Sequence, residues 1–178
     1  TGNLGLGQDL YGLIKNLCNQ REIINKMIDL NIIIEIYGSG SQLSKIKKIL
    51  EYDKSNYKNE GISKIISYKG LIKKESIFKV FKNADCCMLQ IANFKSLSMV
   101  IPSKIFEYAA SGLPIIYNSE GFTKNFINKI DNSIYFKNND PESFLISILN
   151  SMKSKTNLES RNRLLKQYDQ DLILNKYV

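Results

Sequence analysis

The chain has 178 residues, of which 43% are hydrophobic and 24% are charged, so it can bury the core of one globular domain without a disulfide or a metal. No apolar run approaches the roughly 18 residues of a membrane-spanning helix, and the absence of histidine removes Ser-His-Asp and Cys-His catalysis and the commonest zinc ligand. The net charge of +8 favours an anionic partner, either nucleotide phosphates, nucleic acid or an acidic membrane surface.

The first half of the chain alternates strand and helix patterns. Residues 1–4 are interpreted as the end of a truncated strand, followed by a glycine-rich turn and by helical spacing of the apolar residues from Leu10 to Met27. A β-branched run predicts a buried strand, and the polar stretch that comes after the next helix predicts a loop. The expected elements are a strand at 31–37, a helix at 42–52, a loop at 54–61, a strand at 64–68, a helix at 72–81 and a strand at 84–90.

The second half continues the same alternation. A helix at 102–111 is expected to have Pro102 in its first turn and to be stopped by Gly112 and Pro114. Strands at 113–117 and 133–136 and helices at 141–152 and 158–168 follow, and the last ten residues are expected to extend or dock a helix. The order predicts an α/β, Rossmann-like domain with a mostly parallel sheet and helices on both faces, whose ligands lie beyond the carboxyl ends of the strands.

The cysteines and lysines are given structural interpretations. Cys18, Cys86 and Cys87 are expected to be reduced, buried thiols, which fits a reducing cytoplasm. The adjacent pair should alternate across a strand. Lysines on helical segments are interpreted as solvated helix faces, namely Lys45, Lys47, Lys48, Lys79 and Lys82.

Three glycine-containing junctions lie where a strand meets the next segment. Gly5, Leu6 and Gly7 form a turn whose amides could cradle a phosphate, although a tight turn with positive φ explains the glycines equally well. Gly38 and Gly40 open a second turn, for which packing alone is an alternative. Neither turn completes G-x-G-x-x-G, and no P-loop is present. Gly70 and Leu71 follow the end of a strand, and the exposed backbone there could form hydrogen bonds with the edge of a nucleotide base.

The fourth junction carries the most specific pattern. Ile101 and Pro102 precede Ser103 and Lys104, whose free amides at the positive end of a helix suit a diphosphate. Glu107 lies one turn further on, where its carboxylate can accept from two vicinal hydroxyls of a ribose. A capped helix with exposed charged side chains is the alternative. The long segment 93–101 favours a binding loop.

Together these segments resemble the C-terminal domain of retaining glycosyltransferases of family 4, also called group 1, which have the two-domain B-type fold (GT-B). The matching segments are Thr-Gly-Asn-Leu-Gly at 1–5, Ile-Tyr-Gly-Ser-Gly at 36–40, Ala-Asp at 84–85, Pro-Ser-Lys-Ile-Phe-Glu-Tyr at 102–108 and Gly-Leu-Pro at 112–114. The chain looks most like bacterial enzymes that add N-acetylated amino sugars during O-antigen or capsule assembly.

The resemblance implies that residues 1–178 bind a nucleotide diphosphate-sugar, favouring UDP, while an N-terminal domain outside this sequence binds a lipid-linked or saccharide acceptor. It implies that Glu107 binds ribose, that Ser103 and Lys104 hold the diphosphate, that the turn 5–7 lines the phosphates or the sugar, and that Gly70 and Leu71 border the base. It implies no cofactor and no metal, a cytoplasmic protein at the inner face of the membrane, and a domain inactive alone. No residue is assigned a catalytic role.

Three departures from the family pattern limit what can be transferred. Met99 stands where many relatives have a second glutamate, eight residues before Glu107. Asn3 and Gln8 stand where many members have Arg and Lys, so the diphosphate must depend more on Lys104 and on amides. Two other functions stay open: a separately encoded nucleotide-sugar-binding subunit, and a non-catalytic basic domain that docks on an anionic membrane or on nucleic acid.

Overall fold

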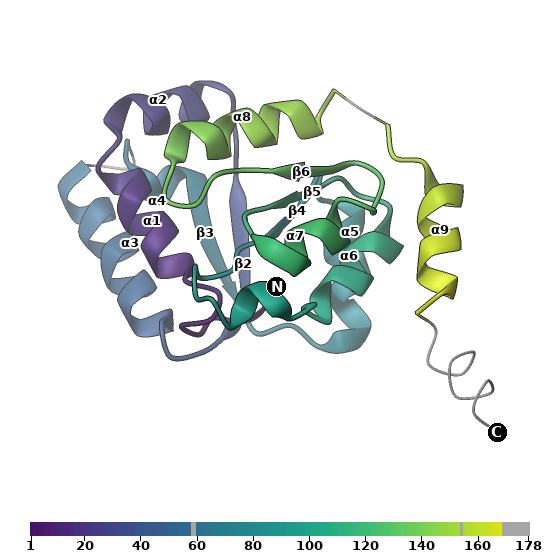
Figure 1. Ribbon diagram of the computed structural model, residues 1–178. Helices are drawn as coiled ribbons and strands as arrows, with labels where there is room; N and C mark the ends of the chain where they lie inside the picture. The colour runs from purple at the N-terminus through teal and green to yellow at the C-terminus, as the bar shows by residue number, and fades with distance from the viewer. Residues whose placement is uncertain (58–59, 154, 169–178) are drawn as a thin grey trace.

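The computed structural model describes residues 1–57, 60–153 and 155–168, and it alternates strands and helices along the chain (Figure 1). The strands form two three-stranded sheets in which all paired neighbours are parallel. The predicted α/β, Rossmann-like class is therefore confirmed. In sheet order, the strands are β1 (Gly2–Asn3), β2 (Ile34–Ser39) and β3 (Ile66–Gly70) in the first sheet, and β4 (Cys87–Leu89), β5 (Ile115–Tyr117) and β6 (Ser133–Tyr135) in the second.

Helices cover both faces of the sheets, and each layer buries its own cluster of apolar side chains. The first cluster is built on α1 (Leu10–Cys18), α2 (Arg21–Asp29), α3 (Leu43–Tyr57), α4 (Ile62–Ile65) and α8 (Pro141–Ser151). The second is built on α5 (Ile77–Lys82), α6 (Lys104–Ser111), α7 (Gly121–Ile127) and α9 (Leu158–Lys166). Two short 3₁₀ turns, η1 (Lys74–Ser76) and η2 (Leu97–Met99), precede α5 and α6.

The side chains of β4 and of Cys86, the residue before it, alternate between the two clusters, as expected for a strand covered on both faces. Cys86 and Met88 pack against the first cluster, whereas Cys87 and Leu89 belong to the second. The predicted alternation of the two adjacent cysteines is confirmed. Cys87 is buried and Cys86 is partly buried, but Cys18 is exposed, because it lies at the end of α1 on the outer side. The expectation that all three thiols are buried was wrong for Cys18.

Strand β2 begins three residues later than predicted, because the chain is still closing helix α2. Asn31 has a positive φ of 53°, and the amide of Ile32 donates to the carbonyl of Met27 at 2.9 Å. These contacts end α2 with a left-handed residue, a common way to terminate a helix. The extended backbone therefore starts at Ile34 and runs to Ser39.

The predicted loop at 54–61 was wrong over its first residues, because α3 continues to Tyr57. Asp53 is buried near the end of this helix, and its carboxylate accepts from the Ser63 amide at 2.9 Å and from the Ser63 hydroxyl at 2.7 Å. This contact fixes the one-turn helix α4 against α3. Because α4 takes up residues expected to be extended, β3 begins at Ile66 instead of 64.

Several other boundaries differ. The apolar run from Leu10 to Met27 is divided at Asn19 and Gln20 into α1 and α2, and the helix expected from 72 starts as a 3₁₀ turn at Lys74. Helix α7 was not predicted, and β4, β5 and β6 are shorter than expected. Helix α8 lies where predicted. The expectation for the last ten residues lies outside the described part of the chain. Within the described part, no helix combines the length and apolarity needed to cross a bilayer.

A buried arginine attaches α9 to the second layer. Arg161 is 1% exposed, and its guanidinium donates to the carbonyls of Asp131 at 2.6 and 2.8 Å and of Leu113 at 2.7 Å. Burial lowers the pKa of Arg161 below its usual value. Each guanidinium nitrogen of Arg161 therefore donates to at least one backbone carbonyl, either near the end of α6 or in the loops beside it. These hydrogen bonds offset the hydration that the buried cation loses.

Candidate functional site

The second glycine turn is packed directly onto the first strand. Gly38 has a φ of 131°, and a Cβ on it would lie 1.8 Å from the carbonyl oxygen of Gly2. A Cβ on Gly40 would lie 2.5 Å from the carbonyl carbon of Leu4. Both contacts involve backbone, which cannot move aside. The packing explanation for Gly38 and Gly40 is therefore sufficient, and their presence alone does not indicate a ligand.

Hydrogen bonds hold the first two turns in fixed register. The Leu4 amide donates to Ser39 at 2.8 Å, and the Gln42 amide donates to Leu4 at 2.9 Å. The buried Gln42 side chain accepts from the Tyr11 amide and donates to Asp9, both at 3.3 Å. Asp9 also caps α1. The two turns therefore form one rigid unit at the carboxyl ends of β1 and β2.

The first turn differs from the second because its glycines are not required by the chain. Neither Gly5 nor Gly7 has a positive φ, so the tight-turn explanation does not account for them. A Cβ on Gly7 would lie 3.7 Å from Leu97, an ordinary contact, and the nearest neighbour of one on Gly5 would be the Asn3 side chain at 3.2 Å. Leu6 is 63% exposed between them. The turn thus presents backbone that an incoming group could approach closely.

Helix α6 begins beside the first strand, where the Lys104 side chain reaches Gly2. Its cap is Ser103, so Pro102 lies just before the cap and not in the first turn as predicted. Pro102 still contributes, because its carbonyl accepts from the Ile105 amide at 3.0 Å and so starts the helical turn. Among the residues that the structure describes, nothing accepts from the amides of Ser103 and Lys104. These amides are available to an anion at the positive end of the helix.

Lys104 and Glu107 lie together on the first turn of α6, as their spacing predicts. The Lys104 ammonium lies 2.8 Å from a Glu107 carboxylate oxygen, and the two side chains are 23% and 38% exposed. The Lys104 side chain also reaches the first strand, since its Cε would lie 3.4 Å from a Cβ on Gly2. The two charges therefore neutralise each other, and a phosphate and a ribose would have to separate them.

The remaining predicted residues lie further out. Gly70 ends β3 with a φ of 89°, and a Cβ on it would meet no atom of the described residues within 4 Å. Leu71 is 78% exposed, whereas Ile101 is half-buried against the second cluster. Because β3 is separated from β1 by β2, Gly70 lies about 10 Å across the sheet from the first turn. The structure therefore packs the turns 5–7 and 38–40 together, places Lys104 against Gly2 of β1, and leaves 70–71 at one side.

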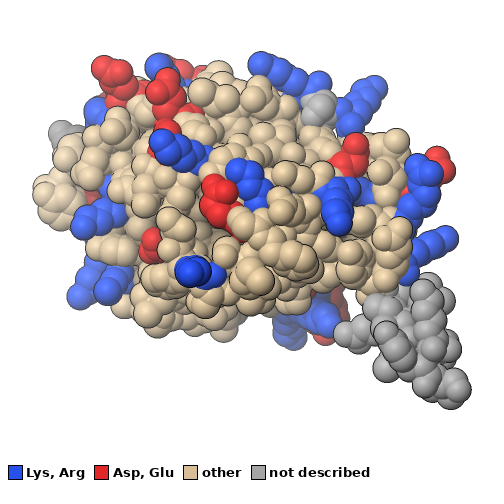
Figure 2. All heavy atoms as spheres, in the orientation of Figure 1, with Lys and Arg blue, Asp and Glu red and all other residues tan. Residues whose placement is uncertain are grey.

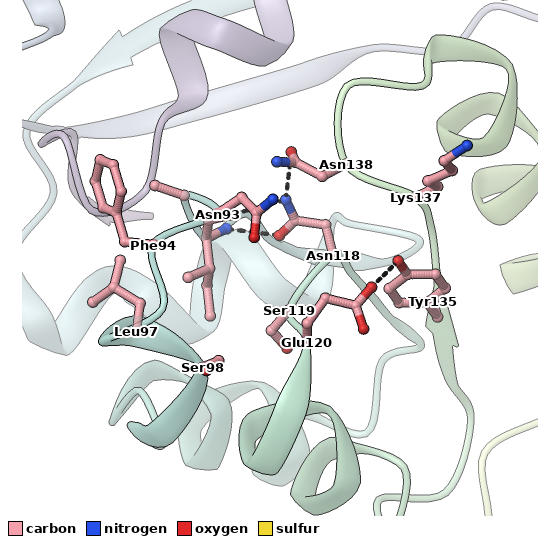
Figure 3. A pocket seen from close by; sticks show the side chains of 12 residues that line it. Asn93, Phe94, Leu97, Ser98, Asn118, Ser119, Glu120, Tyr135, Lys137 and Asn138 are labelled. Atoms are coloured by element: carbon pink, nitrogen blue, oxygen red, sulfur yellow. Dashed lines mark hydrogen bonds between the residues drawn. The ribbon is translucent and has the colours of Figure 1, made fainter.

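A cavity of about 380 Å³ opens beside the first turn, at the carboxyl ends of β4, β5 and β6 (Figure 3). It adjoins the turn, because the Ala92 amide donates to the Gly7 carbonyl at 2.8 Å. The predicted binding loop 93–101 supplies part of its wall through Asn93, Phe94, Leu97 and Ser98. The rest of the lining consists of Ile91, Ala92, Asn118, Ser119, Glu120, Tyr135, Lys137 and Asn138.

Asn118 holds the floor of this cavity in place. Its side chain accepts from the Ile91 amide at 2.7 Å, donates to the Ile91 carbonyl at 2.9 Å and donates to Asn138 at 3.0 Å (Figure 3). Next to it, the buried hydroxyl of Ser119 has no hydrogen-bond partner among the described residues. The cavity therefore combines fixed amide groups with an unused hydroxyl, as suits a polar ligand.

The polar wall at Glu120 was missed by the sequence analysis. The Tyr135 hydroxyl donates to Glu120 (Figure 3), and the Lys124 ammonium lies 3.3 Å from the same carboxylate. Burial and this hydrogen bond raise the pKa of Tyr135 to about 12. A signal was available, because Asn118–Glu120 and residues 137–138 directly follow two predicted strands, at the edge where ligands bind in parallel sheets.

The positive charges outside the site are dispersed. The five lysines interpreted as solvated are all exposed on α3 and α5. On the face shown in Figure 2, lysine and arginine side chains are scattered between acidic and uncharged residues and form no continuous patch. Within the described residues, no three acidic or cysteine side chains are placed to hold a metal ion.

No protein-family model matches the sequence, and no curated protein matches it. Solved structures do match. Staphylococcus aureus TarM, in complex with fondaparinux, α-GlcNAc-glycerol and UDP, is 17% identical with a TM-score of 0.67, and the match covers 99% of this chain and 34% of that one. Anabaena HepE in complex with UDP is 12% identical with a TM-score of 0.67, over 99% and 46% of the two chains.

The catalytic domain of the cholesterol-α-glucosyltransferase from Helicobacter pylori is 14% identical with a TM-score of 0.58, over 100% of this chain and 96% of that one. The chain spans about a third of the length of TarM. At these identities the likeness concerns the fold alone. The chain has the fold of one Rossmann-like half of a GT-B glycosyltransferase.

Proposed function

We propose that this chain is the donor-binding, C-terminal half of a retaining glycosyltransferase of family 4, and that its donor is a UDP-sugar. The observation that carries the proposal is the meeting of three features at one edge: the open turn 5–7, the free amides of Ser103 and Lys104, and the Glu107 carboxylate. Amides at a helix end and a lysine suit a diphosphate, and a carboxylate suits a ribose diol. UDP is supported by its presence in the complexes of TarM and HepE.

The donor would lie along the edge of the sheets. Its base would meet Gly70 and Leu71, its ribose Glu107, and its diphosphate the amides of α6 and the turn 5–7. The sugar would then enter the cavity between the loop 93–98 and Asn118–Glu120, because Gly7 adjoins both the diphosphate position and the cavity wall. Stabilisation of the leaving diphosphate by Lys104 and by helix amides requires no metal.

The wider setting belongs to the same proposal. A second, N-terminal domain would close over the donor and bind a lipid-linked or saccharide acceptor, so the chain alone would bind the donor without transferring the sugar. An N-acetylated sugar and a role in bacterial O-antigen or capsule assembly, in the cytoplasm at the inner face of the membrane, follow from the family resemblance.

Calorimetry with UDP on the chain and on the Glu107→Ala variant tests the central contact. Loss of one or two charge-assisted hydrogen bonds should weaken binding by about 2–5 kcal/mol, or ~30- to several thousand-fold. Part of this loss is offset, because the variant also releases Lys104 from its ion pair. Glu107→Gln, which keeps a hydrogen-bond acceptor, should therefore retain more affinity than Glu107→Ala.

Glu51→Ala, on the exposed face of α3, is the matched control and should bind UDP as the parent chain does. Equal affinity of the Glu107→Ala variant and this control would contradict the ribose assignment. Binding to anionic vesicles that salt abolishes, together with no response to any nucleotide, would instead favour a basic docking domain.

A further inference from the structure

Glu120 is the one acid among the described residues that line the cavity beside the first turn. The loop 93–101, which forms part of the opposite wall (Figure 3), contains no aspartate or glutamate. Apart from Lys137, the other polar lining groups are uncharged amides and hydroxyls. A carboxylate forms shorter and stronger hydrogen bonds than such neutral groups do. Glu120 is therefore the strongest acceptor that a ligand in the cavity can meet.

The backbone of Glu120 is fixed against the loop by the first residues of α7. A Cβ on Gly121 would lie 3.1 Å from Ser98, so the chain passes close to the loop at this point. The Thr123 hydroxyl is fully buried and donates to the carbonyl of Val100 at 2.8 Å. Because α7 begins at Gly121, these contacts also set the position of Glu120 relative to the loop.

The Glu120 carboxylate is oriented by two neighbours and keeps free acceptor positions. One oxygen accepts from the Tyr135 hydroxyl, and the Lys124 ammonium lies 3.3 Å from the other. The same ammonium lies 3.5 Å from the centre of the Tyr135 ring, so the three side chains form one cluster. A carboxylate has about four acceptor positions, and Tyr135 and Lys124 each use one of them. Because Lys124 already balances the charge, the remaining positions suit neutral hydroxyl donors better than a second cation.

The rest of the cavity matches a ring that carries hydroxyls. Ser119, next to Glu120, is 4% exposed, and its hydroxyl has no hydrogen-bond partner among the described residues. A buried polar group without a partner is unfavourable, and a ligand hydroxyl would satisfy it. Phe94 and Leu97 lie on the opposite side (Figure 3) and offer an apolar surface to the C–H face of a ring. A pyranose has both kinds of surface.

We propose that Glu120 is a specificity-determining residue for the sugar of the donor, and that it accepts hydrogen bonds from two neighbouring hydroxyls of a neutral pyranose. Ser119 binds a further hydroxyl, and Tyr135 and Lys124 are positioning residues that hold the carboxylate. The inference rests on the proposed function, because that function places the donor sugar in this cavity. It assigns the choice of sugar to the wall that follows β5, apart from the groups that hold the nucleotide.

Calorimetry on the full chain with UDP and with a UDP-sugar tests the proposal. The UDP-sugar is the one that the parent chain binds most tightly among UDP-glucose, UDP-galactose and UDP-N-acetylglucosamine. In Glu120→Ala the Kd for the UDP-sugar should rise by ~10- to 150-fold, through the lost hydrogen bonds to a charged group. The Kd for UDP, which lacks the transferred sugar, should stay the same. Glu120→Gln keeps one acceptor oxygen, so its Kd for the UDP-sugar should lie between those of the parent and of Glu120→Ala.

Tyr135→Phe should give a smaller rise of the same kind, because Lys124 still holds the carboxylate. Glu142→Ala, at an exposed position in the first turn of α8, is the matched control and should bind both compounds as the parent does. A weaker Kd for the UDP-sugar with an unchanged Kd for UDP in Glu120→Ala supports the inference.

Two results would overturn the inference while UDP still binds to the parent chain. One is an unchanged Kd for the UDP-sugar in Glu120→Ala. The other is an equal rise in the Kd for UDP, because the side chain would then act through the fold or through the nucleotide position. A parent chain that does not bind UDP would contradict the proposed function and, with it, this inference, so the two failures are distinguishable.

Discussion

Replacing Gly7 with alanine separates a glycine kept for a ligand from one kept for the fold. The added methyl group would lie 3.7 Å from Leu97 and would meet a backbone whose φ is not positive. Such a substitution restricts the unfolded chain and should leave stability unchanged or raise it by about 0.4–1 kcal/mol. If the diphosphate contacts this turn, the same methyl group would occupy ligand space.

The expected loss of affinity follows from that intrusion. Forcing one extra carbon into a close contact costs about 1–3 kcal/mol, so the Kd for UDP should rise by ~5- to 150-fold. Two measurements are made on one sample: Tm by thermal denaturation and Kd by calorimetry. The predicted result for Gly7→Ala is a normal or higher Tm with a weaker Kd.

Gly40→Ala is the contrasting variant. Its Cβ would lie 2.5 Å from the carbonyl carbon of Leu4, and backbone cannot give way, so Tm should fall sharply before any ligand is added. Unchanged UDP affinity in the Gly7→Ala variant would refute the placing of the diphosphate at the first turn. A low Tm in that variant would refute the reasoning that the chain itself does not need this glycine.

Three further predictions concern stability. Arg161→Ala should lower the free energy of unfolding by about 3–5 kcal/mol, because it removes the guanidinium that donates to the carbonyls of Asp131 and Leu113, and urea denaturation measures it. Asp53→Ala should lower the free energy of unfolding by about 1–3 kcal/mol, because the hydrogen bonds to Ser63 in α4 are lost. The control Asp29→Ala, at an exposed position, should change the free energy of unfolding little. Burial raises the pKa of Cys87 from 9.0 to about 12, so the unfolded chain loses this proton first and stability should fall as pH rises from about 9 to 12. The slope of stability against pH should be shallower in Cys87→Ala. An equal slope would contradict the raised pKa of Cys87 as the cause of the fall in stability.

The order of strands and helices could be predicted from sequence because apolar periodicity reports which faces are buried. The same periodicity identified the alternation of Cys86 and Cys87 and the extent of α8. The boundaries that failed depend on contacts between distant residues. Asp53 determines α4 through Ser63, ten positions away, and no local pattern in 54–61 contains that information. The start of β2 depends similarly on how Asn31 closes the preceding helix.

The site was predicted unevenly for a related reason. Local spacing was enough to place Lys104 beside Glu107, because both lie on one helical turn. Local spacing could not show that they form an ion pair with each other, or that the wall at Asn118 and Glu120 comes close to the first turn. That proximity arises from the pairing of β4 with β5 and from the loop 93–98, which is a tertiary result.

The glycines then distinguish the parts of this edge that the fold explains from the part that it does not. Gly38 and Gly40 are accounted for by backbone contacts closer than any side chain allows, so a nucleotide adds nothing to their explanation. Gly7 has room for a methyl group and an ordinary φ, yet its carbonyl accepts from the amide of Ala92, which lines the cavity at Asn118. A glycine that the fold does not require, placed beside a polar cavity, is expected where a ligand approaches the backbone closely. The proposed donor site therefore depends on Gly7 and the start of α6, and much less on the glycine pattern as a whole.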